Sequence, residues 1–331
     1  MNVTKTTALA HSNIALVKYW GKRNTQLNLP AVGSISINLE NLHTTTSIEV
    51  KEHLKSDELF LNGNPAKKHE SERVRSFMDL LRKKSGNKIF TEIISHNNFP
   101  TSAGLASSAS AFAALSLAAS CVFGLQSSKE ELSELARQGS GSAARSIYGG
   151  FVEMKKGSRH DGIDAVAIQL APKEHWELRL LIAITSESKK ETGSTDGMKL
   201  SEKTSPYYKG WVKSSTPDID EMRSAIYNKD FQKLGELAEF SCLKMHGLVM
   251  SSRPGLLYWN GTTIEVIHAI KELRRRGTAV YFTIDAGPQV KAICLPKDTI
   301  QIKKELEQIP GVKKIIETPL GGDARIIGGE S

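Results

Sequence analysis

The sequence is poor in cysteine and shows no histidine pattern typical of a metal site. Its 331 residues include only three cysteines, Cys121, Cys242 and Cys294, which lie far apart and outside any CxxC or Cys/His cluster. Neither a disulfide framework nor a zinc site is therefore indicated. The nine histidines show no HExxH or other paired spacing, so metal ligation by histidine is not expected. A reducing compartment fits this cysteine usage best.

Long apolar runs are also missing. The most apolar window, residues 108–125, contains four serines and is too polar for a membrane-spanning helix. The N-terminal residues show no cationic segment followed by an apolar stretch and a small-residue cleavage site, so no signal peptide is expected. The sequence therefore predicts a soluble, cytoplasmic protein without a membrane partner.

The basic residues form neither a long tail nor a stripe interleaved with aromatic residues. The chain has 44 Lys and Arg against 36 Asp and Glu, which gives a formal net charge of +8. Its short basic clusters, at residues 82–84, 189–190 and 274–276, are typical of a solvated surface. A protein that binds nucleic acid would favour a contiguous basic face or a recognised motif, so we expect no nucleic-acid partner. The positive balance suits anionic small substrates.

Hydrophobic periodicity predicts a mixture of helices and strands. Runs rich in branched and aromatic residues predict strands at residues 46–50, 58–61, 91–95, 151–154, 165–170, 178–185, 279–284 and 312–317. Helical spacing or capping signals predict helices around residues 74–81, 111–119, 128–135, 217–248, 264–275 and 300–309, with a capping box of Ser128 and Glu131 at the start of the third. Asn62-Gly63 is a hairpin-type turn signal between two of the strands or beside one. At ~150 residues per domain, the length predicts two domains, which we place at residues 1–185 and 186–331.

The strongest local motif is the small-residue loop PTSAGLASSAS at residues 100–110, which precedes a helix-prone stretch. Small residues let a backbone approach a ligand closely, and the free N–H groups at a helix start bind anions. The motif is neither a Walker A sequence nor a dinucleotide GxGxxG. Its composition and position favour a phosphate-binding loop, with a tight capped turn as the alternative.

Four further groups of polar residues have the right chemistry for anions or catalysis. Lys18, Tyr19, Lys22 and Arg23 crowd into the segment KYWGKR, which suits a polyphosphate better than a core. Arg145 follows the loop SGSAA, and its planar guanidinium matches a carboxylate. Asp285 ends an apolar strand, and residues 190–198 form a polar turn. Solvated turns, a surface arginine and a turn-forming aspartate are the alternatives.

The pattern Pro-x-x-x-Gly-Leu-x-Ser-Ser-Ala in residues 100–109 resembles the phosphate loop of the GHMP kinase superfamily. The kinases usually have glycine at the position of Ala106, and the form of the loop found here, with alanine, resembles that of the decarboxylase branch. Residues 10–39, 137–152 and 281–290 also resemble segments of the mevalonate diphosphate decarboxylases, in the same order along the chain. The resemblance implies an α+β, two-domain GHMP-kinase-like fold with the active site in the cleft between the domains.

The resemblance also implies roles for individual residues. Asp285, Arg145 and Lys18 would be catalytic: Asp285 over the substrate hydroxyl, and Arg145 and Lys18 at the substrate carboxylate. The residues that would bind substrate are Tyr19, Trp20, Gly21, Lys22, Arg73, Ser140, Gly141, Ser142, Ala143, Ala144, Arg145, Ser194 and Thr195. The ATP phosphate loop would consist of Ser102, Ala103, Gly104, Leu105, Ala106, Ser107 and Ser108. Magnesium would accompany ATP, with its protein ligands unassigned.

The implied reaction is ATP-dependent decarboxylation of (R)-mevalonate 5-diphosphate to isopentenyl diphosphate, ADP, phosphate and carbon dioxide, carried out by a homodimer. Phosphorylation would turn the 3-hydroxyl into a good leaving group. Alternatives within the superfamily are a phosphomevalonate decarboxylase and a mevalonate 3-kinase. The carboxylate-binding set of Lys18, Arg145 and Asp285 argues against a pure kinase, and Tyr19, Lys22 and Arg73 favour a diphosphate substrate.

Overall fold

Two long strands, β1 (Lys5–Val17) and β4 (Ser34–Val50), form the middle of the larger β-sheet in a computed structural model that describes residues 3–99, 107–188 and 190–330. They pair in antiparallel fashion along nearly their whole length. The described strands of this sheet follow the order β14–β1–β4–β7–β5–β6, and β8 joins β4 to β9. The remaining strands are β5 (Glu58–Leu61), β6 (Asn64–Pro65), β7 (Thr91–Asn97), β8 (Phe151–Met154), β9 (Ala167–Ala171) and β14 (Arg325–Glu330).

A smaller antiparallel sheet belongs to the C-terminal half of the chain and has the order β11–β12–β10–β13. Its strands are β10 (Arg179–Ile184), β11 (Val280–Thr283), β12 (Val290–Cys294) and β13 (Lys314–Pro319). A separate ribbon pairs β2 (Lys22–Asn24) with β3 (Leu29–Pro30). This ribbon begins within the segment KYWGKR, at Lys22, so its turn lies beside the candidate site.

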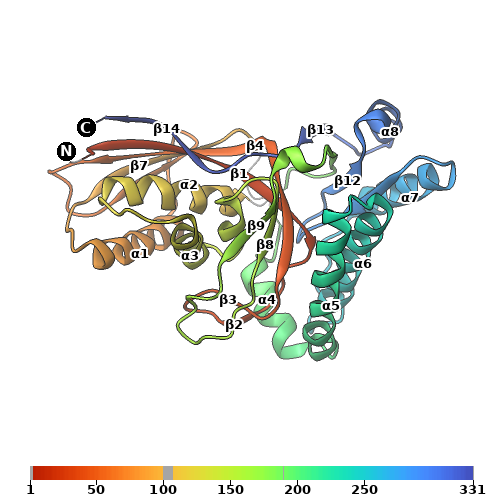
Figure 1. Cartoon of the computed structure of the whole chain (residues 1–331), viewed down its shortest axis with the longest axis horizontal. Coiled ribbons are helices and arrows are strands. Elements are labelled where there is room, and N and C mark those ends of the chain that lie inside the picture. Colours follow the sequence, from red (N-terminus) through yellow and green to blue (C-terminus); the bar gives the residue numbers. More distant parts are fainter. Residues whose placement is uncertain (1–2, 100–106, 189, 331) are drawn as a thin grey trace.

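The helices divide between the two sheets. Helices α1 (Lys68–Ser85), α2 (Ser107–Val122) and α3 (Lys129–Gly139) lie together along the larger sheet, whereas α5 (Tyr208–Tyr227), α6 (Phe231–Met250), α7 (Gly261–Arg275) and α8 (Thr299–Glu307) gather at the other end of the molecule (Figure 1). Helix α4 (Ser194–Thr204) lies near β2 and β3 (Figure 1). Short 3₁₀ turns occupy Ala143–Ser146, Lys173–His175 and Pro296–Asp298. None of the helices in the described ranges is long and apolar enough to cross a membrane.

Two local predictions are confirmed at atomic detail. Ser128 Oγ accepts a hydrogen bond from the Glu131 backbone N–H, and the Glu131 side chain accepts one from the Ser128 N–H, which completes the predicted capping box of α3. Between β5 and β6, Asn62 and Gly63 both have positive φ, 50° and 81°, as a two-residue hairpin turn requires. Local sequence therefore predicts these two element ends correctly.

Strand pairing divides the chain differently from the boundary that we predicted between residues 185 and 186. Strand β10 precedes that boundary but pairs with β12 and β13 of the smaller sheet. Conversely, β14 near the C-terminus pairs with β1 of the larger sheet, so that the first and last described strands lie side by side (Figure 1). The apolar pattern of β10 predicts a strand but not its partners. The pairing of β10 with the smaller sheet favours a domain boundary before β10. The residue limits of the two domains stay a prediction.

An apolar core joins the two halves of the chain. Ile14 and Ile37 of the larger sheet pack in one buried cluster with Leu180 and Ile182 of β10 and with residues of α5 and α6. Burial of this kind contributes roughly 25 cal/mol for each Å² of apolar surface removed from water. The C-terminal end of β1 is thereby fixed against the smaller sheet, and this contact positions the candidate site.

Candidate active site

Lys18 and Asp285, which are 267 positions apart in sequence, form an ion pair where the two halves of the chain meet. Lys18 Nζ donates to Asp285 Oδ1 at 2.7 Å and to the Ala15 carbonyl at 2.8 Å. The Lys18 side chain is 1% exposed and that of Asp285 is 25% exposed, so the carboxylate is the member of the pair that a ligand can reach. The Lys18 backbone N–H donates to Ser241 Oγ of α6 at 2.9 Å, which anchors the end of β1.

The charges around Asp285 keep its carboxyl group ionised. Burial would raise the pKa of Asp285, but the ammonium groups of Lys18 and Lys291 and the guanidinium of Arg145 together hold that pKa below its ordinary value. A carboxylate of lowered pKa is a weak base that accepts hydrogen bonds well. Asp285 is therefore suited to orienting a hydroxyl and to receiving its proton as the oxygen reacts.

Arg145 is buried in a cradle of neutral oxygens. Its Nε donates to Ser36 Oγ at 3.0 Å and its Nη1 to Ser34 Oγ at 2.6 Å, while Nη2 donates to Asn13 Oδ1 at 3.2 Å. Among the described residues, no carboxylate lies within ion-pair distance of this guanidinium. Burial lowers the pKa of Arg145 to about 10, so the group stays protonated at neutral pH. Such an arginine is preorganised to bind an anionic ligand.

The loop SGSAA at residues 140–144, here called the serine loop, follows α3 and contacts the start of α2. Ser140 Oγ lies 3.2 Å from Ser108 Oγ and 3.4 Å from Ser142 Oγ. The predicted phosphate loop and the predicted substrate loop are thus neighbours at this point. Ser107 and Ser108 are the first two residues of α2, whereas the predicted site residues Ser102, Ala103, Gly104, Leu105 and Ala106 lie outside the described residues.

Tyr19 packs against the backbone of the same serine loop. Its buried hydroxyl has no hydrogen-bond partner among the described residues, and its ring lies 5.8 Å from the Arg145 guanidinium carbon. A Cβ atom at Gly141 would come within 2.2 Å of Tyr19 Oη. The missing side chain at position 141 therefore leaves room for a tyrosine hydroxyl that can donate to a ligand.

We predict that Gly141→Ala weakens substrate binding because the added methyl group must displace Tyr19. Overpacking at a tight contact costs about 1–3 kcal/mol, which corresponds to a roughly 5- to 150-fold loss in kcat/KM if the strain falls on the site. Steady-state kinetics measures this loss. Gly210→Ala is the matched control, because a Cβ there meets nothing within 4 Å. Equal kinetics for the two variants would contradict the predicted contact.

Lys22 and Arg73 bring two cations to the other side of the serine loop. Lys22 Nζ donates to Asn28 Oδ1 at 2.7 Å and lies 3.5 Å from Thr195 Oγ1 at the start of α4. Arg73 of α1 donates through Nη2 to the Gly139 carbonyl at 2.7 Å. Burial and the nearby positive charges of Arg73 and Lys199 lower the pKa of Lys22 to about 8, although Asp196 opposes this shift. This pair of crowded cations is suited to a diphosphate.

Lys190 links the polar turn to the residue after Asp285. Its Nζ donates to Ser194 Oγ at 2.9 Å and to the Ala286 carbonyl at 3.1 Å. Burial lowers the pKa of Lys190, and the negative charge of Asp285 acts in the opposite direction. Of the two residues predicted in this turn, Ser194 thus contacts Lys190 and Thr195 contacts Lys22. Sequence reasoning passed over Lys190 itself because lysines are common in exposed turns.

Some predicted substrate-binding side chains are used for packing. The Trp20 indole lies in a buried cluster and donates to Ser201 Oγ at 3.2 Å. Ala143 and Ala144 are fully buried in the core of the larger sheet. Gly21 has φ of 102°, and a Cβ there would lie 2.5 Å from Tyr208 Oη. These four residues shape the backbone around the site, and any direct ligand contact by them stays a prediction.

Sequence reasoning also missed buried polar residues that complete the site. Lys291 is 2% exposed in the otherwise apolar strand β12, and burial lowers its pKa to about 8 although Asp285 raises it. A lone lysine within an apolar run is a signal that could have identified it. Ser34 and Ser36 alternate with buried isoleucines in β4. That alternation normally marks a solvent face, whereas here the polar face contacts Arg145.

The site offers few ligands for a resident metal ion. Among the described residues, no group of three or more His, Cys, Asp or Glu side chains is arranged to hold one. Mg²⁺ commonly keeps several waters and is bound through substrate phosphates with one or two protein oxygens. The hydroxyls of Ser107 and Ser108 at the start of α2 provide such oxygens. The residues therefore fit a magnesium ion that arrives with a nucleotide.

Comparison with known proteins covers nearly the whole chain. A family model described as the diphosphomevalonate decarboxylase-like N-terminal domain matches residues 10–167. A second, described as the mevalonate 5-diphosphate decarboxylase C-terminal domain, matches residues 180–323. The diphosphomevalonate decarboxylase of Candida albicans is 37% identical over 338 residues, which cover 95% of this chain and 92% of that protein.

Solved structures agree with these sequence matches. The crystal structure of mevalonate diphosphate decarboxylase from Staphylococcus aureus is 37% identical, with a TM-score of 0.92 and 98% of each chain covered. A structure of MDDEF in complex with MVAPP, AMPPCP and magnesium has a TM-score of 0.91 at 36% identity and covers 98% of this chain and 99% of its own. The two-domain α+β architecture predicted from the sequence is thereby confirmed.

Proposed function

Because this chain belongs to the diphosphomevalonate decarboxylase family, we propose that it catalyses the ATP-dependent conversion of (R)-mevalonate 5-diphosphate to isopentenyl diphosphate, ADP, phosphate and carbon dioxide. The observation that carries the proposal is that the site holds both a carboxylate kept ionised by a lysine and a guanidinium that has no carboxylate partner in the described part of the chain. Asp285 is held by Lys18 at 2.7 Å, and Arg145 donates only to neutral oxygens in the described part of the chain. One group suits the substrate hydroxyl and the other its carboxylate.

The first chemical step is phosphorylation of the tertiary 3-hydroxyl, which is a poor leaving group until it carries a phosphoryl group. Asp285 orients this hydroxyl and receives its proton as the new oxygen–phosphorus bond forms. Because Lys18 keeps the carboxylate ionised and fixed, the hydroxyl oxygen is directed at the nucleotide without a change in the position of Asp285. Phosphoryl transfer otherwise depends mainly on positioning and on neutralising charge.

Loss of the phosphate leaves positive charge developing at the tertiary carbon while the carboxylate leaves as carbon dioxide. The electron pair of the breaking carbon–carbon bond forms the new double bond. Arg145 holds the carboxylate in place during this step, since its fork of donors binds both carboxylate oxygens. The serines and asparagine around Arg145 fix the guanidinium plane, so the substrate is bound in one orientation.

ATP and magnesium fit the serine-rich junction between α2 and the loop after α3. Ser107 and Ser108 would hold the magnesium-bound phosphates, and the ion supplies charge neutralisation when bound. MDDEF, a neighbour in structure, is in complex with AMPPCP and magnesium, which supports this assignment. The chain's own contribution is to hold the hydroxyl groups together, with Ser108 Oγ 3.2 Å from Ser140 Oγ.

The two cations at the opposite end of the site favour a diphosphate over a monophosphate. Lys22 and Arg73 interact electrostatically, and both are linked to the end of α3, Arg73 directly and Lys22 through Asn28. A monophosphate would leave part of this positive charge uncompensated. A mevalonate 3-kinase would need no buried guanidinium for a carboxylate that stays on the product, so Arg145 also argues for the decarboxylase. Homodimer formation and a cytoplasmic location remain part of the proposal.

The proposal is tested by assaying mevalonate, mevalonate 5-phosphate and mevalonate 5-diphosphate side by side with ATP and magnesium. We expect equal amounts of ADP and carbon dioxide from the diphosphate, and much slower release from the other two compounds. ADP without carbon dioxide from all three would exclude the decarboxylase and favour the 3-kinase. Fastest carbon dioxide release from the monophosphate would favour a phosphomevalonate decarboxylase.

A further inference from the structure

One asparagine side chain connects Lys22 to the end of helix α3. Asn28 lies in the turn between β2 and β3 with φ of 51°, in the left-handed region. Its Oδ1 accepts from Lys22 Nζ at 2.7 Å, and its Nδ2 donates to the Gln138 carbonyl at 2.8 Å. A lysine can only donate and a carbonyl can only accept, so these partners fix the orientation of the Asn28 amide.

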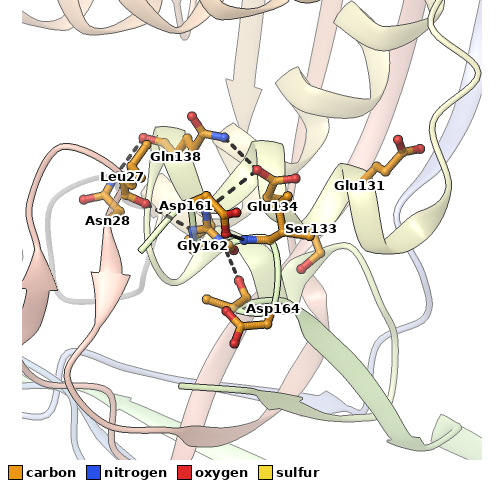
Figure 2. Close-up of polar contacts among 12 residues, drawn as sticks. Leu27, Asn28, Glu131, Ser133, Glu134, Gln138, Asp161, Gly162 and Asp164 are labelled. Carbon is orange, nitrogen blue, oxygen red and sulfur yellow. Dashed lines mark hydrogen bonds and ion pairs between the residues drawn. The ribbon is translucent and has the colours of Figure 1, made fainter. Parts of the chain in front are cut away.

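The end of α3 bonds one cation directly and is linked to a second cation through Asn28. The last carbonyl groups of a helix lack partners within the helix and carry partial negative charge. Here the Gln138 carbonyl accepts from Asn28, and the adjacent Gly139 carbonyl accepts from Arg73 Nη2 at 2.7 Å. Figure 2 shows Asn28 beside Gln138 at this helix end. Lys22 and Arg73 repel each other. The partial negative charge of a helix C-terminus opposes such repulsion.

The turn that carries Asn28 is itself fixed by a buried arginine. Arg137 of α3 is completely buried, donates through Nε to the Leu27 carbonyl at 3.1 Å and through Nη1 to the Gly162 carbonyl at 2.7 Å. Leu27 and Gly162 accordingly lie close to the end of α3 in Figure 2. Arg137 thus holds the carbonyl of the preceding residue and Gln138 holds the Asn28 amide, so Asn28 Oδ1 is a fixed acceptor for the Lys22 ammonium.

We infer that Asn28 is a positioning residue that directs the Lys22 ammonium toward the diphosphate of the substrate. The inference rests on the proposed function, because it takes the diphosphate as the ligand of Lys22. A turn that needed only left-handed backbone would be served by glycine, which adopts this conformation at no steric cost. The additional hydrogen bonds of the Asn28 amide connect Lys22 to the end of α3, and the loop that carries Ser140 and Arg145 follows that helix end.

The charged groups that face Lys22 bring its protonation into a pH range in which kinetics can follow it. Arg73 from α1 and Lys199 from α4 are positive, Asp196 from α4 is negative, and burial with this surplus lowers the pKa of Lys22 to about 8. The ammonium is present below that pKa and is lost as pH rises through it. The KM for mevalonate 5-diphosphate should therefore increase above pH 8 in the wild type, and that increase should disappear in Lys22→Met.

The first test is Asn28→Gly, which keeps the left-handed turn and removes the amide. Loss of a hydrogen bond to a charged group predicts a roughly 10- to 100-fold increase in the KM for mevalonate 5-diphosphate. The KM for ATP should stay unchanged. Asn62→Gly is the matched control, because Asn62 is also left-handed, with φ of 50°, but lies in the β5–β6 turn. An unchanged substrate KM in Asn28→Gly overturns the inference.

A double-mutant cycle separates positioning from a general structural role. In the Lys22→Met background, Asn28→Gly should raise KM no further, because the group that Asn28 positions is already gone. A full additional increase would show that Asn28 acts elsewhere and would overturn the inference. If Asn28→Gly fails to fold, Asn28→Asp serves instead. Its carboxylate should raise the pKa of Lys22 and move the increase in KM to higher pH, and an unmoved profile overturns the inference.

Binding of inorganic pyrophosphate, measured by calorimetry, distinguishes this inference from the proposed function. Wild type that releases no carbon dioxide from mevalonate 5-diphosphate refutes the function. The inference then still stands if pyrophosphate affinity falls in Asn28→Gly and in Lys22→Met, and the double variant loses no more affinity than Lys22→Met alone. In the converse case, the wild type is active and Asn28→Gly binds pyrophosphate as tightly as the wild type does. That result would support the function and refute the positioning role of Asn28.

Discussion

Asp285→Asn should reduce turnover by ~10²- to 10⁴-fold while ATP binding stays nearly intact. The amide has almost the same shape and can still accept the hydrogen bond from Lys18, so the ion pair becomes an ordinary hydrogen bond without a cavity. It cannot take the proton of the substrate hydroxyl. The loss should therefore appear in kcat, measured as ADP release under saturating substrate, with ATP affinity followed separately by calorimetry.

Asp79→Asn provides the matched control for this substitution. Asp79 is 69% exposed on α1, where it pairs with Arg82, and the change is the same carboxylate-to-amide replacement. We expect wild-type turnover from that variant. If Asp285→Asn also turned over at the wild-type rate, Asp285 would not be the group that handles the hydroxyl proton. A loss of ATP binding together with turnover would indicate damage to the site instead.

Arg145→Lys should lower kcat/KM for mevalonate 5-diphosphate on the order of 10²- to 10³-fold, because removing one partner of a buried charged pair costs 2–5 kcal/mol or more. An ammonium has no planar fork and cannot satisfy Ser34, Ser36 and Asn13 while also binding both oxygens of a carboxylate. Arg159→Lys, at a side chain 59% exposed, is the control and should leave the kinetics unchanged.

The product offers an internal control for the Arg145 prediction. Isopentenyl diphosphate keeps the diphosphate but has lost the carboxylate. Its inhibition constant should therefore stay close to the wild-type value in Arg145→Lys, while affinity for the carboxylate-bearing substrate falls. Equal losses for product and substrate would show that the variant disturbs the whole site, and equal retention would show that Arg145 does not bind the carboxylate.

The predicted elements succeed where the local signal is strong. The hairpin at Asn62 and Gly63 and the capping box of α3 depend on residues within a few positions of each other. The long strand β1 escaped prediction because ten successive residues of it, Ala8–Val17, are buried and include His11, Ser12 and Asn13. A strand covered on both faces shows no alternation, and polar residues in it disguise its burial.

The candidate site divides in the same way. The small-residue loops and the cations Lys18, Lys22 and Arg145 were visible as motifs, and the family resemblance assigned them roles. The partners of these groups were not visible. Ser34, Ser36 and Asn13 hold Arg145 from strands more than 100 positions away, and no local pattern specifies a contact at that separation. Lys190 and Asn28 look like ordinary turn residues until the turns are placed beside the site.

The sequence by itself determined which chemical groups are present: a predicted phosphate loop, a guanidinium, a lysine cluster and an aspartate at a strand end, together with the local helices and turns. Only the tertiary structure decided how these groups act on one another. Lys18 meets Asp285 because the apolar core fixes β1 against the smaller sheet. Burial at this junction lowers the pKa of Arg145 and would raise that of Asp285, but the ammonium groups of Lys18 and Lys291 hold the pKa of Asp285 below its ordinary value.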